Sequence, residues 1–170
     1  MSDVKWLEPG EERAWRLLQM MQMRLNAELS RDLGSHSQLS YQDYVVLVAL
    51  TDRPEGGMRV FELGRHLGWE KSRTSHQVAR MVTRGLVDKR ACGADRRGQV
   101  VVVTGRGRQA IAAAAPSHLA AVRRLFVDRL TPAQLGELAV VAEVVLAAVD
   151  EVEERRCHEG DGKAAGPAGH

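Results

Sequence analysis

The chain has 170 residues, enough for one compact domain or for one domain with helical extensions. Apolar residues make up 44% and aromatic residues only 4%, a balance that favours helical packing over a β-sandwich. The sequence has no apolar signal-peptide core and no stretch near the roughly 18 apolar residues of a membrane span, so we expect a cytoplasmic protein. Its two cysteines, Cys92 and Cys157, should therefore stay reduced.

The net charge of +2 conceals an uneven distribution of charge along the chain. Between Arg59 and Arg108 there are twelve Lys and Arg residues against four Asp and Glu residues, a surplus of +8, and the rest of the chain carries −6. A basic block inside an acidic frame indicates a surface that binds a polyanion. On charge alone, a solvated basic face is an equally good interpretation.

Two helices are expected in the first part of the chain. The first follows Gly10, carries apolar residues at spacings of three and four, and ends at Gly34. The second begins at Ser40, whose hydroxyl can cap it while Asp43 lies in the first turn, and it breaks at residues 52–57.

The middle of the chain changes from a helical to a strand pattern. Two short helices are expected over residues 60–67 and 72–85, joined by a tight turn, and two strands over 86–90 and 99–103. A polar, glycine-flanked hairpin tip separates the strands at 92–98. This order predicts a winged helix-turn-helix, whose second helix fits the major groove of DNA while the hairpin reaches phosphates or the minor groove.

The last part of the chain predicts two longer helices. Thr104 caps the first of them, which is kinked or restarted at Pro116. The second opens with a capping box at Thr131 and carries a heptad stripe from Leu135 to Val152, with further apolar residues on its other faces. Such a helix must pack against more than its own domain, so we expect a homodimer. The expected dimer interface comprises Leu135, Leu138, Val145 and Val149.

The helix expected over 72–85 has two distinct faces. Thr74, Val78 and Met81 share the side that packs inward, and the opposite side carries hydroxyl, imidazole and guanidinium groups that suit phosphates and guanine edges. At the hairpin tip, arginines suit a narrow minor groove, and Asp95 is expected to orient one of them. The predicted DNA-binding residues are Lys71, Ser72, Arg73, Ser75, His76, Gln77, Arg80, Arg84, Asp95, Arg96 and Arg97.

These segments resemble the MarR family of bacterial regulators. The matching strings are residues 69–76, the Arg-Gly-Leu-Val of 84–87, the Asp-Arg-Arg-Gly of 95–98 and the Thr-x-x-Gly of 104–107. Thr74 departs from the apolar residue usual in the family. The resemblance implies a homodimer built from the first and last two helices that binds pseudo-palindromic duplex DNA. It also implies a repressor, sometimes an activator, that is often released by a small aromatic ligand or by oxidation.

We therefore expect a mainly α fold with a small β-hairpin wing, in which a winged helix-turn-helix is flanked by a helical dimerisation domain. The expected boundaries are 11–38 and 108–156 for dimerisation, 39–107 for DNA binding, and 157–170 for a flexible tail too rich in Gly and Ala to fold alone. In the family, effectors lodge between these regions. Candidate walls are Trp15, Met20, Met23, Tyr41 and Tyr44, although Met and aromatic residues at helical spacing more often belong to plain core.

Other functions have less support in the sequence. The sequence has no Ser/His/Asp or Cys/His arrangement, no phosphate-binding Gly loop and no HExxH motif. We therefore expect no enzyme activity, no cofactor and no metal. The scattered histidines leave open a metal site assembled in three dimensions. A winged helix used only for protein contacts disagrees with the basic block. A redox-sensing regulator acting through Cys92, which lies beside several cations, is a further alternative. The family's peroxide sensors have a reactive Cys near the N-terminal helix, and this chain has none there.

Overall fold

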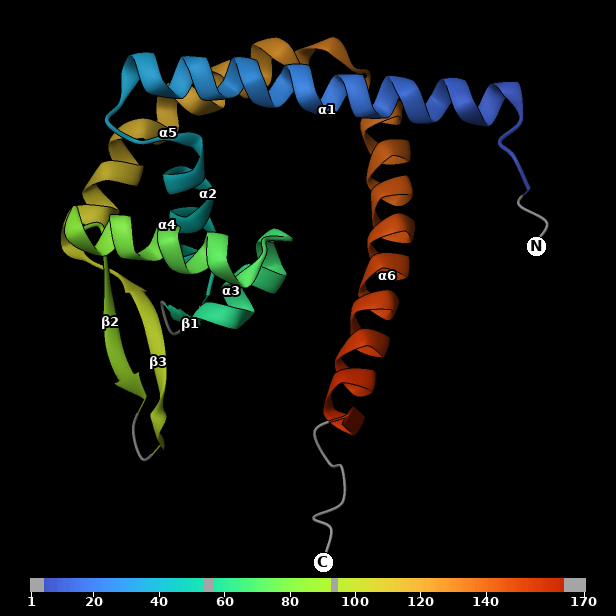
Figure 1. Cartoon of the computed structure of the whole chain (residues 1–170). Helices are drawn as coiled ribbons and strands as arrows, with labels where there is room; N and C mark the ends of the chain where they lie inside the picture. The colour runs from blue at the N-terminus through green and yellow to red at the C-terminus, as the bar shows by residue number, and fades with distance from the viewer. Residues whose placement is uncertain (1–4, 54–56, 93–94, 164–170) are drawn as a thin grey trace, which may run out of the picture. The chain divides into compact units, whose positions relative to one another are not determined.

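The computed structural model describes residues 5–53, 57–92 and 95–163 (Figure 1). Its elements, in chain order, are α1 (Pro9–His36), α2 (Tyr41–Thr51), β1 (Gly57–Arg59), α3 (Val60–Leu67), α4 (Lys71–Thr83), β2 (Val87–Cys92), β3 (Asp95–Val103), α5 (Gly105–Leu125), the 3-10 helix η1 (Val127–Arg129) and α6 (Pro132–Lys163). The chain divides after Val122 into two compact units. The predicted fold class, mainly α with a small β wing, is confirmed.

The first unit is built around the helices α2, α3 and α4. Leu47, Leu63 and Val78, one from each helix, are completely buried in a common apolar core. α3 and α4 approach closely at Gly64, where a Cβ atom would lie 3.0 Å from Thr74 Oγ1. Gly68, with a φ of 62°, ends α3 and turns the chain into α4.

A three-stranded antiparallel sheet with the order β1-β3-β2 packs beside these helices. The hairpin strands are longer than predicted, because β2 continues to Cys92 and residues 95–98 of the predicted tip belong to β3. Residues 93 and 94 lie outside the described residues. The sequence did not predict β1, which pairs Met58 with Val101. Gly57 fits there because a Cβ atom would lie 2.8 Å from the Val101 carbonyl oxygen.

Side-chain caps define the ends of α1 and α2. α1 runs two residues past its predicted end at Gly34, and Ser37 then closes it by donating its backbone N–H to the Leu33 carbonyl at 2.9 Å. The predicted start of α2 is confirmed. Ser40 Oγ accepts the Asp43 N–H at 3.1 Å, and Asp43 Oδ2 accepts the Ser40 N–H at 2.9 Å.

Thr104 fastens the start of α5 to the rest of the first unit. Its hydroxyl accepts the Gly107 N–H at 3.0 Å and donates to the Gly85 carbonyl at 2.7 Å. Gly107 is required at this junction because a Cβ atom would lie 2.1 Å from the Leu86 carbonyl oxygen. α5 continues through Pro116, so the helix does not restart there.

The second unit contains η1 and α6. The predicted capping box of α6 is confirmed, since Gln134 Oε1 accepts the Thr131 N–H at 2.9 Å and Thr131 Oγ1 accepts the Gln134 N–H at 3.3 Å. α6 extends to Lys163, seven residues beyond the predicted boundary at 156. The helix thus includes the first part of the segment that was expected to be a tail. Residues 164–170 lie outside the described residues. Of the helices that are described, none is long and apolar enough to cross a membrane.

Candidate nucleic-acid interface

Helix α4 has the two faces expected of a recognition helix. Thr74, Val78 and Met81 are buried against the core of the first unit, at spacings of three and four residues. Other polar residues of α4 face solvent because they lie on the opposite side of the same helix. The exposed residues are Lys71, Ser72, Arg73, Ser75, His76 and Arg80.

The guanidinium of Arg73 lies over the indole ring of Trp69, 4.4 Å from the ring centroid. Trp69 is itself half-buried against the core at the turn between α3 and α4. This cation–π contact therefore restricts Arg73 on the exposed side of α4. A groove runs alongside, between the start of α2 and α4, and both Arg73 and Arg80 line it together with Ser40 and Gln42. The guanidinium of Arg80 beside a hydroxyl and an amide suits a phosphate of the DNA backbone.

Two of the predicted contact residues, Gln77 and Arg84, have hydrogen-bond partners within the chain. Asp43 is fully buried at the start of α2. Its Oδ1 accepts a hydrogen bond from Gln77 Nε2 at 2.7 Å, and its Oδ2 accepts one from an Arg84 terminal nitrogen at 2.5 Å. The other terminal nitrogen of Arg84 donates to the Gln38 carbonyl at 2.6 Å. Gln77 is therefore turned away from solvent, and Arg84 links the end of α4 to the segment before α2.

Burial and hydrogen bonding act in opposite directions on Asp43. Burial would raise the pKa of its carboxyl group, but hydrogen bonds from Arg84 and Ser40 outweigh burial and hold the pKa below its usual value of 3.8. Asp43 is therefore ionised near neutral pH. The sequence indicated only its capping role, because nothing in the pattern pointed to partners that lie 34 and 41 residues away.

The base of the wing is described in full and its tip is not. Lys89 and Arg90 on β2 are exposed. β2 and β3 pair from Val87 opposite Val103 outward, with an irregularity in register between Ala91 and Cys92. The side chains of residues 92–98, and with them Cys92, Asp95, Arg96 and Arg97, lie outside the described part of the structure, so the orienting role of Asp95 stays a prediction.

Comparison with known proteins identifies the family. A family model described as MarR family matches residues 37–98. AbsC, a MarR family transcriptional regulator from Streptomyces coelicolor, is 36% identical, with a TM-score of 0.79 over 87% of this chain and 99% of AbsC. Sco3205, a MarR family transcriptional regulator from the same organism whose structure is a complex with DNA, is 32% identical, with a TM-score of 0.80 over 87% of this chain and 92% of Sco3205. This chain belongs to the MarR family.

The family resemblance noted in the sequence is thereby confirmed, and the chain is a DNA-binding transcriptional regulator with a winged helix. A variant of MarR from E. coli, in complex with operator DNA, has the same fold at 21% identity and a TM-score of 0.65, over 77% of this chain and 91% of that protein. No curated protein matches the chain in sequence.

The five candidate ligand residues of this MarR-family regulator fall into two groups. Trp15, Met20 and Met23 are exposed on α1. Tyr41 and Tyr44 on α2 are half-buried beside an α5 residue that the sequence did not predict. This residue is His118, whose ring centroid lies 4.3 Å from that of Tyr44 and 6.4 Å from that of Tyr41.

His118 combines burial with incomplete hydrogen bonding. Its Nδ1 is buried without a hydrogen-bond partner among the described residues. Burial lowers the pKa of the imidazole, and the charge of Asp32 opposes that shift without reversing it. A neutral imidazole beside two tyrosines is therefore the polar part of an otherwise aromatic cluster. Its position on α5 gave the sequence no signal, because the neighbouring residues are mostly Ala.

The predicted dimer residues lie on α6 of the second unit. Leu135 and Leu138 are half-buried, whereas Val145 and Val149 are exposed by 55% and 47% in the single chain. Valines on other faces of α6 are also exposed. Across the described ranges, no cluster of three or more His, Cys, Asp or Glu residues is placed to hold a metal ion.

Proposed function

We propose that this MarR-family protein is a sequence-specific repressor that acts in the cytoplasm and binds pseudo-palindromic duplex DNA as a homodimer. The observation that carries the proposal is the exposed face of α4, where Arg73, His76 and Arg80 lie opposite the buried side of the helix. An α-helix with such a face fits the major groove, and a basic hairpin beside it reaches the phosphates or the minor groove.

The contacts divide between base edges and phosphates. Arg73 is the candidate base reader, because its stacking on Trp69 restricts the guanidinium before DNA arrives. Lys71 and Arg80 are candidate phosphate contacts, as are Arg96 and Arg97 at the wing. Gln77 and Arg84 are left out of this set because both side chains donate to the buried Asp43 carboxylate.

The homodimer is supported by the exposed apolar residues of α6, which an isolated chain leaves in water. Release by a small molecule is supported by the cluster of Tyr41, Tyr44 and His118, where a buried ring nitrogen has no partner among the residues described. A compact effector with an aromatic ring and a hydrogen-bonding group suits these surroundings.

Selection of bound fragments from the source genome, followed by footprinting, tests the DNA-binding proposal. We expect protection of two half-sites about 10 bp apart, centre to centre. If Arg73 makes a bidentate base contact, Arg73→Ala should reduce the difference in binding free energy between specific and random duplexes by about 1–3 kcal/mol.

Arg65→Ala is the matched control for Arg73→Ala. Arg65 lies over the Phe61 ring, 5.9 Å from its centroid, in a similar contact on α3 rather than on the recognition face. Specificity should survive this substitution. Protection of a single asymmetric half-site, or an equal loss of specificity in both variants, would contradict the proposal.

A further inference from the structure

Three arginines lie along one side of α4, the last of them at its C-cap. Arg73, Arg80 and Arg84 are seven and four residues apart, so whole turns of the helix bring them to the same side. Their guanidinium groups are nevertheless held in three different ways. These differences decide what each arginine can contribute to DNA binding.

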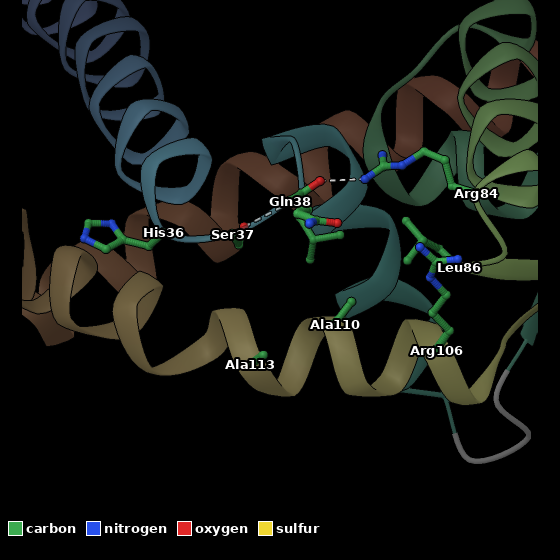
Figure 2. Close-up of a pocket in the computed structure, with 9 residues that line it drawn as sticks. His36, Ser37, Gln38, Arg84, Leu86, Arg106, Ala110 and Ala113 are labelled. Atoms are coloured by element: carbon green, nitrogen blue, oxygen red, sulfur yellow. Dashed lines mark hydrogen bonds between the residues drawn. The ribbon is translucent and has the colours of Figure 1, made fainter.

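Arg84 and Arg80 are the two extremes. One terminal nitrogen of Arg84 donates to the Asp43 carboxylate at 2.5 Å and the other donates to the Gln38 carbonyl at 2.6 Å (Figure 2). Arg80 is exposed, and among the described residues it has no hydrogen-bond or ion-pair partner. A mobile guanidinium of this kind suits a phosphate, which fixes position without reading sequence.

Arg73 combines a restricted position with free donors. Its guanidinium carbon lies 4.4 Å from the centroid of the Trp69 ring. Within the described ranges, no acceptor takes a hydrogen bond from its guanidinium and no carboxylate pairs with it. The contact with the ring therefore holds the group in place and leaves its N–H donors available for another partner.

Trp69 can hold Arg73 because it is itself fixed in the turn between α3 and α4. Its backbone N–H donates to the Gly64 carbonyl at 2.8 Å, directly after Gly68 has turned the chain with a φ of 62°. Its carbonyl oxygen would lie 3.2 Å from a Cβ atom at position 64, so the turn is closely packed. The indole ring is half-buried against the core of the first unit. Both backbone and side chain thus anchor the ring beneath Arg73.

A restricted guanidinium at this place favours guanine. Arg73 lies in the first turn of α4, the part of a recognition helix that contacts base edges. In the major groove, guanine presents the O6 and N7 acceptors to the fork of an arginine, whereas adenine presents a donor beside N7. A guanidinium has no acceptor for that donor. Because Arg73 is restricted before binding, it loses little conformational freedom in this contact.

We propose that Trp69 is a positioning residue, which holds Arg73 so that the recognition helix selects a guanine at one position of each half-site. The inference rests on the proposed function and extends it to a residue outside the recognition helix. Without the ring, Arg73 keeps its charge and its attraction for any duplex but loses the orientation that selects the base.

Replacement of single guanines by 7-deazaguanine, which lacks the N7 acceptor, tests the selection in the footprinted operator. Fluorescence anisotropy with the full chain measures the affinity for each duplex and for a random duplex, at constant ionic strength because affinity depends on salt. At one guanine of each half-site, the replacement should weaken binding by the unsubstituted protein at least about fivefold. Arg73→Ala should bind the modified and unmodified operators alike.

Two substitutions of Trp69 separate its ring from its packing. Trp69→Leu keeps an apolar side chain against the core, so affinity for the random duplex should not change. The loss caused by 7-deazaguanine should shrink about two- to fivefold, the size of a cation–π contact at an exposed site. Trp69→Phe provides a ring again and should recover most of the loss. Phe61→Leu is the matched control, because it removes the ring beneath Arg65 on α3 and should leave the loss unchanged.

Nuclear magnetic resonance of the free protein tests the stacking without DNA. The ring current of the indole should shift the side-chain protons of Arg73 upfield, and Trp69→Leu should return them to their usual positions. The same spectra show whether Trp69→Leu is folded. Unshifted Arg73 protons in the unsubstituted protein would overturn the stacking and with it the proposal.

Each remaining outcome also decides the matter. An equal loss with 7-deazaguanine in Trp69→Leu and the unsubstituted protein would overturn the positioning role. An equal weakening of specific and random binding in Trp69→Leu would do the same, since it indicates a structural role alone. A loss that persists in Arg73→Ala would show that another residue reads the guanine. Failure of the unsubstituted protein to distinguish its operator from random DNA would instead refute the proposed function, and the selection of guanine would fall with it.

Discussion

At the scale of single residues, the Asp43 side chain joins the start of α2 to two residues of the recognition helix and its end. One buried carboxylate caps α2, holds Gln77 and pairs with Arg84. A buried charge is costly unless it is paired and hydrogen-bonded, and here each carboxylate oxygen has a partner. Asp43 therefore adds a polar link between α2 and the end of α4 to the apolar core that the two helices share.

Removing the charge of Asp43 should destabilise the protein while leaving it folded. Asp43→Asn keeps the shape of the side chain but leaves Arg84 with a weaker acceptor, so the free energy of unfolding should fall by about 1–3 kcal/mol. Arg84 is 36% exposed, and solvent limits the loss. Asp128→Asn is the control, because its 2.6 Å pair with Arg123 is exposed and should cost below about 1 kcal/mol. Urea unfolding measures both, and equal losses would contradict the role of Asp43.

His118 should make stability depend on pH. Its pKa is lowered from 6.5 in the folded state, so the unfolded chain binds more protons over the interval between the two values. The stability contributed by neutral His118 is therefore fully present above pH 6.5 and is lost as the pH falls through the lowered pKa.

His118→Gln tests this dependence because glutamine cannot titrate. Urea unfolding at several pH values between 8 and 5 should show a smaller loss of stability on acidification in the variant than in the unsubstituted protein. Parallel curves for the two proteins would show that another group is responsible.

At the scale of elements, the sequence predicted helix starts well because each is determined by side chains within one turn. Ser40, Thr104 and Thr131 all cap the helices they were expected to cap. The sequence did not predict β1. Its three residues show no alternation of apolar and polar side chains, and they gain a strand conformation only by pairing with β3. Ladders formed with distant segments leave no local signal.

For the candidate site, the sequence predicted which residues of α4 face solvent better than it predicted contacts between distant segments. The 3.6-residue period separated the buried Val78 from the exposed Arg73 and His76. It did not exclude Gln77, which lies at the border between the two faces of α4 and whose polar side chain is typical of an exposed position. Only the position of Asp43, far away in the sequence, explains why Gln77 turns inward.

The junction of α5 with the wing should tolerate substitution at one glycine and not at another. Gly107→Ala places a Cβ atom against the Leu86 carbonyl oxygen, at 2.1 Å before any shift, so the start of α5 must move and stability should fall by about 1–3 kcal/mol. Gly105→Ala meets nothing within 4 Å and should be neutral or stabilise by up to about 1 kcal/mol, because alanine favours the helix. Thermal unfolding of the two variants provides the comparison, and equal Tm values would contradict the close approach.

At the scale of the whole molecule, the exposed valines of α6 should control assembly. Val145→Asp with Val149→Asp would bury unpaired charge in the proposed dimer interface, at a cost on the order of several kcal/mol, and should produce monomers. Ala147→Asp adds a charge on the opposite side of the heptad stripe and should leave the dimer intact. Light scattering at micromolar concentration distinguishes these outcomes. A monomeric unsubstituted protein would refute the dimer.

The short strand β1 also determines how the wing is supported. It pairs with residues 100–102 of β3 and with none of residues 95–99. At the base of the hairpin β3 is thus the central strand of a three-stranded sheet, and beyond Val100 the hairpin continues as a two-stranded ribbon. Backbone pairing on both sides of β3 therefore supports the root of the wing, whereas beyond Val100 β3 is paired with β2 alone. In the proposed complex with DNA, we therefore expect the root of the wing to keep its position relative to the recognition helix.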